Sequence, residues 1–108
     1  MRLTTEQCLA IHRATCEFFP SGSVVRLFGS RLDDHRRGGD IDLLVETPMP
    51  LIPGDLVERR SRFIARLYRS LGEQKIDVLV APAGVPDDRP VVQTARREGQ
   101  LLTAELTI

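Results

Sequence analysis

The sequence predicts an α/β (α+β) domain in which helices flank a small mixed sheet. Three observations predict this class. Apolar residues recur at helical spacing in three segments, three shorter runs are apolar and β-branched, and the two kinds of segment follow one another as α-β-β-α-β-α. The 108 residues suit a single domain over 1–108, with three or four strands in its sheet. Contents of 42% hydrophobic and 28% charged residues are typical of a globular chain, so intrinsic disorder is not expected.

The first part of the chain predicts one helix and two strands. The helix is expected to begin at residues 4–5, where a threonine can cap it, and to end at the Pro-Ser-Gly of 20–22. Five of its residues recur at helical spacing: Leu9, Ala10, Arg13, Cys16 and Phe19. Strands are expected over 24–28 and 40–46, joined by a charged loop over 31–39.

The second part predicts a long helix over 55–71, ended by Gly72, a strand over 75–80, and a short helix over 91–98. The apolar stripe of the long helix is Leu56, Phe63, Ile64, Leu67 and Leu71. Four arginines fall largely on its other side, either as a solvated face or as a surface for an anion or a partner: Arg59, Arg62, Arg66 and Arg69.

Charge and composition exclude several classes of function. The 15 Lys and Arg residues balance 15 Asp and Glu residues, so the chain lacks the cationic field of a general nucleic-acid or membrane binder. No apolar run approaches the roughly 18 residues that span a bilayer, and residues 1–7 lack the apolar core of a signal peptide. Cys8 and Cys16 on one helix would be about 12 Å apart, too far to pair. We therefore expect reduced core thiols in a cytoplasmic protein.

Three aspartates stand in otherwise apolar strands. Asp40 and Asp42 flank Ile41, and side chains two apart on a strand point to the same face. Asp77 lies inside another apolar strand, where aspartate is disfavoured. Taken singly, Asp40 could cap a strand end and Asp77 could pair with Lys75 or an arginine. Together they predict a cluster of carboxylates whose repulsion a divalent cation would relieve.

A candidate phosphate site precedes these aspartates. Gly29 and Ser30 directly follow the first strand, so the glycine would let the backbone come close to a phosphate while Ser30 offers a hydroxyl. Alone, such a dipeptide is most often a plain turn. Followed by Asp-Ile-Asp after nine intervening residues, it is far more specific.

The combination of Gly29-Ser30, Asp40-Ile41-Asp42 and Asp77 resembles the polymerase-β-like nucleotidyltransferase superfamily, and most closely its minimal nucleotidyltransferases. These are small bacterial proteins often encoded beside a HEPN-type toxin as its antitoxin. The resemblance covers residues 24–80, and residues 96–102 also look like the terminal motif of such proteins.

The resemblance implies a polymerase-β-like fold and a residue-specific function. Gly29 and Ser30 would hold the triphosphate of ATP, Asp40 and Asp42 would bind two Mg²⁺ ions, and Asp77 would ligate the catalytic metal and help to activate the acceptor hydroxyl. The implied reaction transfers a nucleoside monophosphate, AMP from ATP, to a hydroxyl on the partner toxin. Two alternatives stay open: a binding module that neutralises such a partner by contact alone, and a homodimeric transferase acting on a small molecule.

Overall fold

The computed structural model describes residues 3–29, 40–72 and 74–102, and it confirms the predicted α/β class. Its elements, in chain order, are α1 (Thr5–Phe18), β1 (Val24–Phe28), β2 (Ile41–Thr47), α2 (Pro53–Leu71), β3 (Ile76–Pro82), α3 (Pro90–Glu98) and β4 (Gln100–Leu102). The six predicted elements are all present, with bounds that differ by one or two residues. The strand β4 is an element that the sequence did not predict.

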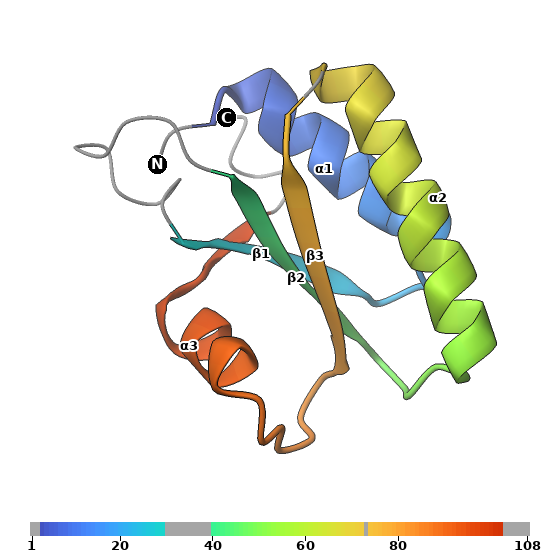
Figure 1. Cartoon of the computed structure of the whole chain (residues 1–108), viewed down its shortest axis with the longest axis vertical. Helices are drawn as coiled ribbons and strands as arrows, with labels where there is room; N and C mark the ends of the chain where they lie inside the picture. The colour runs from blue at the N-terminus through green and yellow to red at the C-terminus, as the bar shows by residue number, and fades with distance from the viewer. Residues whose placement is uncertain (1–2, 30–39, 73, 103–108) are drawn as a thin grey trace.

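The four strands form one mixed sheet in the order β3-β2-β1-β4. β1 pairs antiparallel with both β2 and β4, whereas β2 and β3 are parallel and are connected through α2. Helices α1 and α2 lie side by side against one face of the sheet, and α3 lies against the other (Figure 1). No helix in the described ranges is long and apolar enough to cross a membrane.

Alternate residues of β1, β2 and β3 contribute to two apolar clusters. The larger one lies between the sheet and the pair α1–α2, and includes Ile41, Leu43 and Val45 of β2, all with no exposed surface. The smaller one lies under α3: Phe28, Leu44, Ala81, Val92 and Ala95. Because α3 is only nine residues long, the far end of this second face is left for polar side chains.

The buried face of α1 differs from the predicted one. Thr4 caps the helix as expected, in a reciprocal capping box with Gln7. The residues that the helix buries are Cys8, Ile11, Ala14 and Thr15. Of the predicted stripe, Arg13 and Cys16 are exposed, so the prediction of a second core thiol was wrong. Both cysteines are free, as predicted.

The arginine row of α2 is partly a packing surface. Arg59 donates to the Phe18 carbonyl and to Asp55, and Arg66 binds Glu17 while its guanidinium lies 5.2 Å from the centre of the Phe18 ring. Arg62, by contrast, pairs with its helical neighbour Glu58, its one ion-pair partner in the described part of the chain, and both are well exposed. Half of this row therefore joins α2 to the end of α1, which the prediction of a solvated face did not include.

A buried carboxylate joins α3 to the sheet. Glu46 of β2 is 6% exposed and accepts hydrogen bonds from Arg26 of β1 and Arg96 of α3, at 2.7 Å and 3.1 Å. Arg96 also donates to the carbonyls of Val85 and Pro82. Arg96 thus connects α3 to β2, to the last residue of β3 and to the loop that follows it.

The outer edge of β3 is covered by guanidinium groups. The parallel register with β2 turns the backbone groups of Val78, Val80 and Pro82 away from the sheet. Each of these three carbonyls accepts a hydrogen bond from an arginine. The pairs are Arg60 to Val78 at 2.8 Å, Arg89 to Val80 at 3.2 Å and Arg96 to Pro82 at 2.9 Å. Charged side chains on an edge strand oppose further strand pairing.

Candidate metal and nucleotide site

The parallel pairing of β2 and β3 brings the three predicted aspartates together. Asp42 and Asp77 are direct partners in the register of the two strands, so their side chains leave the sheet side by side. Asp40 lies two residues before Asp42 and therefore on the same face. One carboxylate oxygen from each of the three residues lies within 4.8 Å of the other two.

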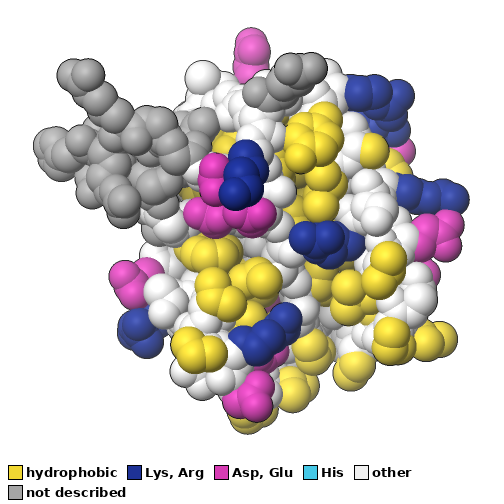
Figure 2. All heavy atoms as spheres, viewed as in Figure 1, with side chains coloured by type: hydrophobic (Ala, Val, Ile, Leu, Met, Phe, Trp, Pro, Cys, Tyr) yellow, Lys and Arg dark blue, Asp and Glu magenta, His cyan; other side chains and the backbone are white. Residues whose placement is uncertain are grey.

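The cluster lies at the end of the sheet face that α3 leaves open. Figure 2 shows acidic side chains gathered beside one basic side chain near the middle of this face, with apolar side chains below them. Asp77 is exposed, the Asp40 side chain is 38% exposed, and Asp42 is partly buried. A solute can therefore reach all three carboxylates from one side.

The environment of Asp42 disfavours its negative charge. Burial raises the pKa of the Asp42 carboxyl, and the nearby carboxylates of Asp77 and then Asp40 raise it further, together with a hydrogen bond to Asp77. The ammonium of Lys75 opposes this shift in the Asp42 pKa. In the metal-free protein, the cluster is thus short of positive charge.

The three aspartates suit a hard divalent cation. Carboxylate oxygens are the ligands that Mg²⁺ and Mn²⁺ prefer, and sites for Mg²⁺ often use only one or two protein carboxylates beside substrate phosphates. Burial is the main cause of the raised pKa of Asp42, and the neighbouring carboxylates of Asp77 and Asp40, which a bound cation would neutralise, add to it. Asp40, Asp42 and Asp77 are the residues that could hold such an ion.

Gly29 lies against the same cluster. It follows β1, whose last residue, Phe28, is the register partner of Asp42. Its φ of +78° belongs to the left-handed region that glycine adopts without strain. A Cβ atom at this position would collide with the Asp42 carboxylate. The glycine therefore keeps the backbone close to the acidic cluster, whereas the other predicted phosphate-binding residue, Ser30, lies outside the described residues.

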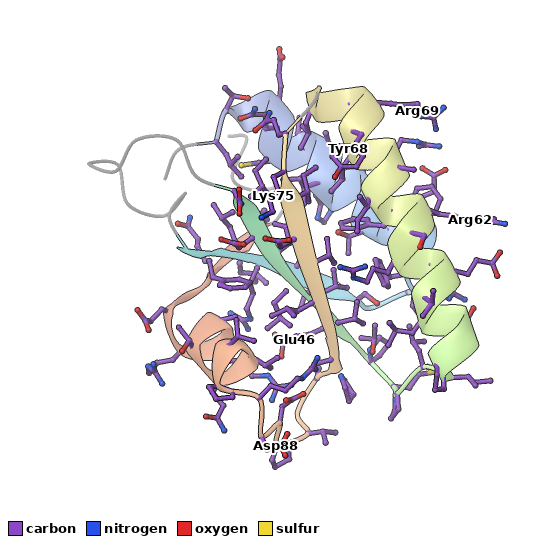
Figure 3. The ribbon with its side chains drawn as sticks, viewed as in Figure 1. Glu46, Arg62, Tyr68, Arg69, Lys75 and Asp88 are labelled. Carbon is purple, nitrogen blue, oxygen red and sulfur yellow. The ribbon has the colours of Figure 1, made fainter. Side chains whose placement is uncertain are left out.

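Lys75 has a different partner from the one considered for it in the sequence. The sequence suggested an ion pair with Asp77, but the Lys75 Nζ lies 3.6 Å from the Asp40 Oδ2. Figure 3 shows Lys75 near the first residues of β2 and β3, with Glu46 much farther along β2. The spacing of the acidic residues gave no indication of this pairing, because it depends on the register between two strands.

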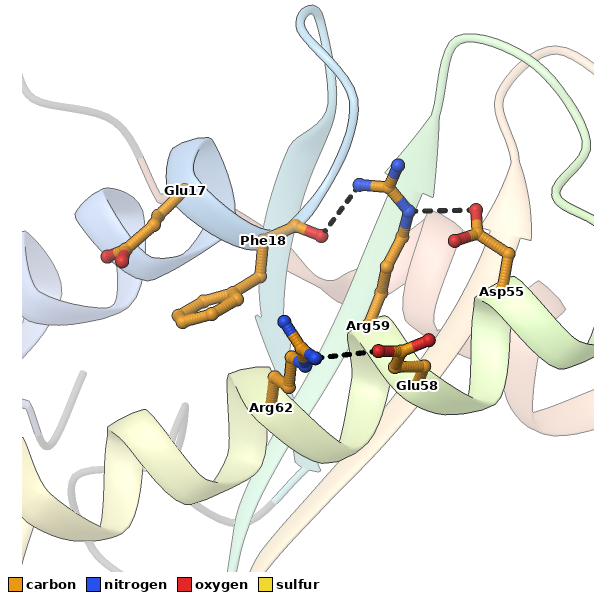
Figure 4. Close-up of a pocket in the computed structure, with 6 residues that line it drawn as sticks. All are labelled: Glu17, Phe18, Asp55, Glu58, Arg59 and Arg62. Atoms are coloured by element: carbon orange, nitrogen blue, oxygen red, sulfur yellow. Dashed lines mark hydrogen bonds and ion pairs between the residues drawn. The ribbon is translucent and has the colours of Figure 1, made fainter.

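Two pockets lie away from this cluster and contain none of the predicted site residues. The first, of about 260 Å³, lies between the end of α1 and the start of α2 (Figure 4), and its lining residues are Glu17, Phe18, Asp55, Glu58, Arg59 and Arg62. The second lies before α3. There, hydrogen bonds from Arg89 lower the pKa of Asp87 to about 2. Arg59 and Arg62 in the first pocket pair with Asp55 and Glu58, and Arg89 in the second pairs with Asp87.

Comparison with known proteins found no protein-family model and no curated protein that matches this chain.

Proposed function

We propose that this protein is a metal-dependent nucleotidyltransferase that transfers AMP from ATP to a hydroxyl group on a partner protein in the cytosol. The observation that supports it best is the convergence of Asp40, Asp42 and Asp77 beside the tight turn at Gly29. A cluster of three carboxylates and a close backbone approach are what metal-assisted phosphoryl transfer needs in one place.

Each residue of the cluster would have a distinct role. Asp40, Asp42 and Asp77 would hold Mg²⁺. Asp77, the most exposed of the three, would orient the acceptor hydroxyl and take up its proton as the oxygen bonds to the α-phosphorus and pyrophosphate leaves. Gly29, with Ser30 beside it, would let backbone N–H groups approach the phosphates. When bound, Mg²⁺ supplies charge neutralisation of the triphosphate and promotes ionisation of the acceptor hydroxyl.

The proposed acceptor is a tyrosine or other hydroxyl on a HEPN-type toxin, for which this chain would be the antitoxin. The resemblance described above supports this choice. The open face around the aspartates also supports a macromolecular acceptor, since no element in the described part of the chain covers that end of the sheet. A partner that completes the site would place its hydroxyl beside Asp77, and such positioning can lower the barrier by about 7–11 kcal/mol.

Co-expression with the neighbouring gene, followed by incubation with α-labelled ATP and Mg²⁺, tests this function. We expect a stable complex, transfer of label to the partner, and an AMP-sized increase in the intact mass of the partner. The double variant Asp40→Asn/Asp42→Asn should form the complex without transfer. If the wild-type complex never labels its partner, neutralisation by contact alone becomes the better account. If free small molecules are labelled instead, a homodimeric transferase acting on a small molecule becomes the better account.

A further inference from the structure

Lys75 completes a square of charged side chains with the three aspartates. Its backbone carbonyl accepts the N–H of Ile41 at 3.0 Å, which fixes the start of β3 beside the start of β2. Lys75 and Asp77 are two residues apart, as are Asp40 and Asp42, so all four side chains leave the same face of the sheet. Lys75 faces Asp40, and Asp77 faces Asp42. Among the described residues, Lys75 is the one cation that forms an ion pair with the three aspartates.

Lys75 is also the only lysine in the sequence, since the other 14 of the 15 basic residues are arginines. The chain uses arginine wherever a carboxylate is held firmly, as in Arg26–Glu46 at 2.7 Å and Arg59–Asp55 at 2.8 Å. Arginine makes a planar, fixed pair with a carboxylate, whereas lysine is a compact point charge on a flexible stem. A lysine at this one position therefore suits a positive charge that can leave one partner for another.

The ion pair itself does little for the fold. At 3.6 Å it is longer than a charge-assisted hydrogen bond, and the two side chains are 72% and 38% exposed. Exposed pairs of this kind contribute little to stability. The ammonium can leave Asp40 at little cost, and its side chain is free to reach a ligand above the same face.

We propose that Lys75 is the counter-ion of Asp40 in the metal-free protein, and that it moves to a phosphate oxygen of the nucleoside triphosphate once a divalent ion has taken Asp40. Lys75 is thus a positioning residue for the nucleotide and a competitor of the metal ion. This inference rests on the proposed function, because it takes the aspartates as the metal site. It makes two predictions of opposite sign for one substitution.

Lys75→Met is the substitution that separates the two effects. It should bind Mn²⁺ alone about two- to fivefold more tightly than the wild type, because an exposed ion pair no longer competes for Asp40. In the presence of Mn²⁺ it should bind the α,β-methylene analogue of ATP about tenfold more weakly, because a hydrogen bond to a charged phosphate is lost. Isothermal titration calorimetry measures both affinities. Arg69→Met is the matched control, since it removes one positive charge from the end of α2, where Arg69 points away from the cluster (Figure 3).

The single lysine allows an independent readout on the wild-type protein. Acetylation of the wild type by a limiting amine reagent, followed by peptide mass spectrometry, reports the reactivity of the Lys75 amine against that of the N-terminus. Mn²⁺ should increase the labelling of Lys75, and further addition of the ATP analogue should decrease it. Lys75→Arg gives the background, and because it keeps the charge its affinity for Mn²⁺ should not rise.

The outcomes separate this inference from the proposed function. Tighter Mn²⁺ binding with weaker nucleotide binding in Lys75→Met, and neither change in Arg69→Met, supports the exchange. If the wild type binds Mn²⁺ through the aspartates but the affinity of Lys75→Met for Mn²⁺ or for the ATP analogue is unchanged, the exchange is overturned and the metal site still holds. Wild type that binds no Mn²⁺ at millimolar concentration overturns both.

Discussion

At Gly29 the backbone comes so close to the carboxylate of Asp42 that no side chain fits between them. We predict that Gly29→Ala loses about 1 kcal/mol of stability, the usual cost of an alanine in the left-handed region. It should also weaken Mn²⁺ binding by at least tenfold, because the new methyl group displaces Asp42. Thermal unfolding and calorimetric titration with Mn²⁺ measure the two effects.

Gly84 offers a control with the same backbone and open space. Its φ is +73°, and nothing lies within 4 Å of a Cβ atom built there. Gly84→Ala should lose the same stability and keep its affinity for Mn²⁺. Equal Mn²⁺ affinities for the two alanine variants would show that the Gly29 contact has no part in the site.

The raised pKa of Asp42 has a consequence for stability. Folding raises this pKa above the usual 3.8, so the folded state binds the proton more tightly than the unfolded chain. The free energy of unfolding therefore falls as the pH rises from about 3.8 through the higher pKa of the folded state. In EDTA at pH 7, Asp42→Asn should unfold about 1–5 °C above the wild type, and this gain should shrink towards pH 4. An asparagine variant that is less stable than the wild type at pH 7 would contradict the assignment.

Among the elements, α3 depends on one ionic cluster as well as on its apolar contacts. We predict that Glu46→Gln loses about 2–3 kcal/mol, because both Arg26 and Arg96 lose their buried anion. Urea denaturation measures the loss. Glu58→Gln is the control, since it breaks an exposed pair with Arg62 and should cost about 0.5 kcal/mol or less. Similar losses in the two variants would mean that the cluster does not anchor α3.

The sequence predicted strands and helices well where their periodicity was strong, and less well elsewhere. The stripe of α2 is confirmed, with Phe63 and Leu67 fully buried. In α1, apolar and small residues occur on several sides of the helix, so the pattern alone did not separate the buried side of Cys8 from the exposed side of Cys16. The strand β4 has three residues, too few to show an alternation.

For the candidate site, the alternation of side chains in two strands was enough to place the aspartates on one face of the sheet. It could not predict which side chains of neighbouring strands pair with one another. The prediction that Asp40, Asp42 and Asp77 converge is confirmed. The pairing of Lys75 with Asp40 and the burial of Glu46 between two arginines depend on register and on the position of α3, both of which are tertiary.

At the scale of the whole molecule, a bound ion would tie together the starts of two strands that are separated by the length of α2. We predict that Mn²⁺ raises the melting temperature, because it binds the aspartates only when β2 and β3 are paired. At a concentration one hundred times Kd the gain is about 2.7 kcal/mol, or roughly 10–20 °C for a domain of this size. Thermal melts across a Mn²⁺ series measure it, with NaCl of equal ionic strength as the control. Asp40→Asn/Asp42→Asn should show no rise, and an equal rise in that variant would place the ion elsewhere.

The arginine side chains along the edge of β3 affect how this small protein can associate with other chains. A strand from a second copy would need the carbonyls of Val78, Val80 and Pro82 as acceptors, yet each already holds a guanidinium, and Pro82 has no N–H to give in return. The three arginine side chains therefore oppose main-chain addition along the Val78–Pro82 part of this edge. The face that carries the three aspartates can thus stay open while extension of the sheet along β3 is disfavoured.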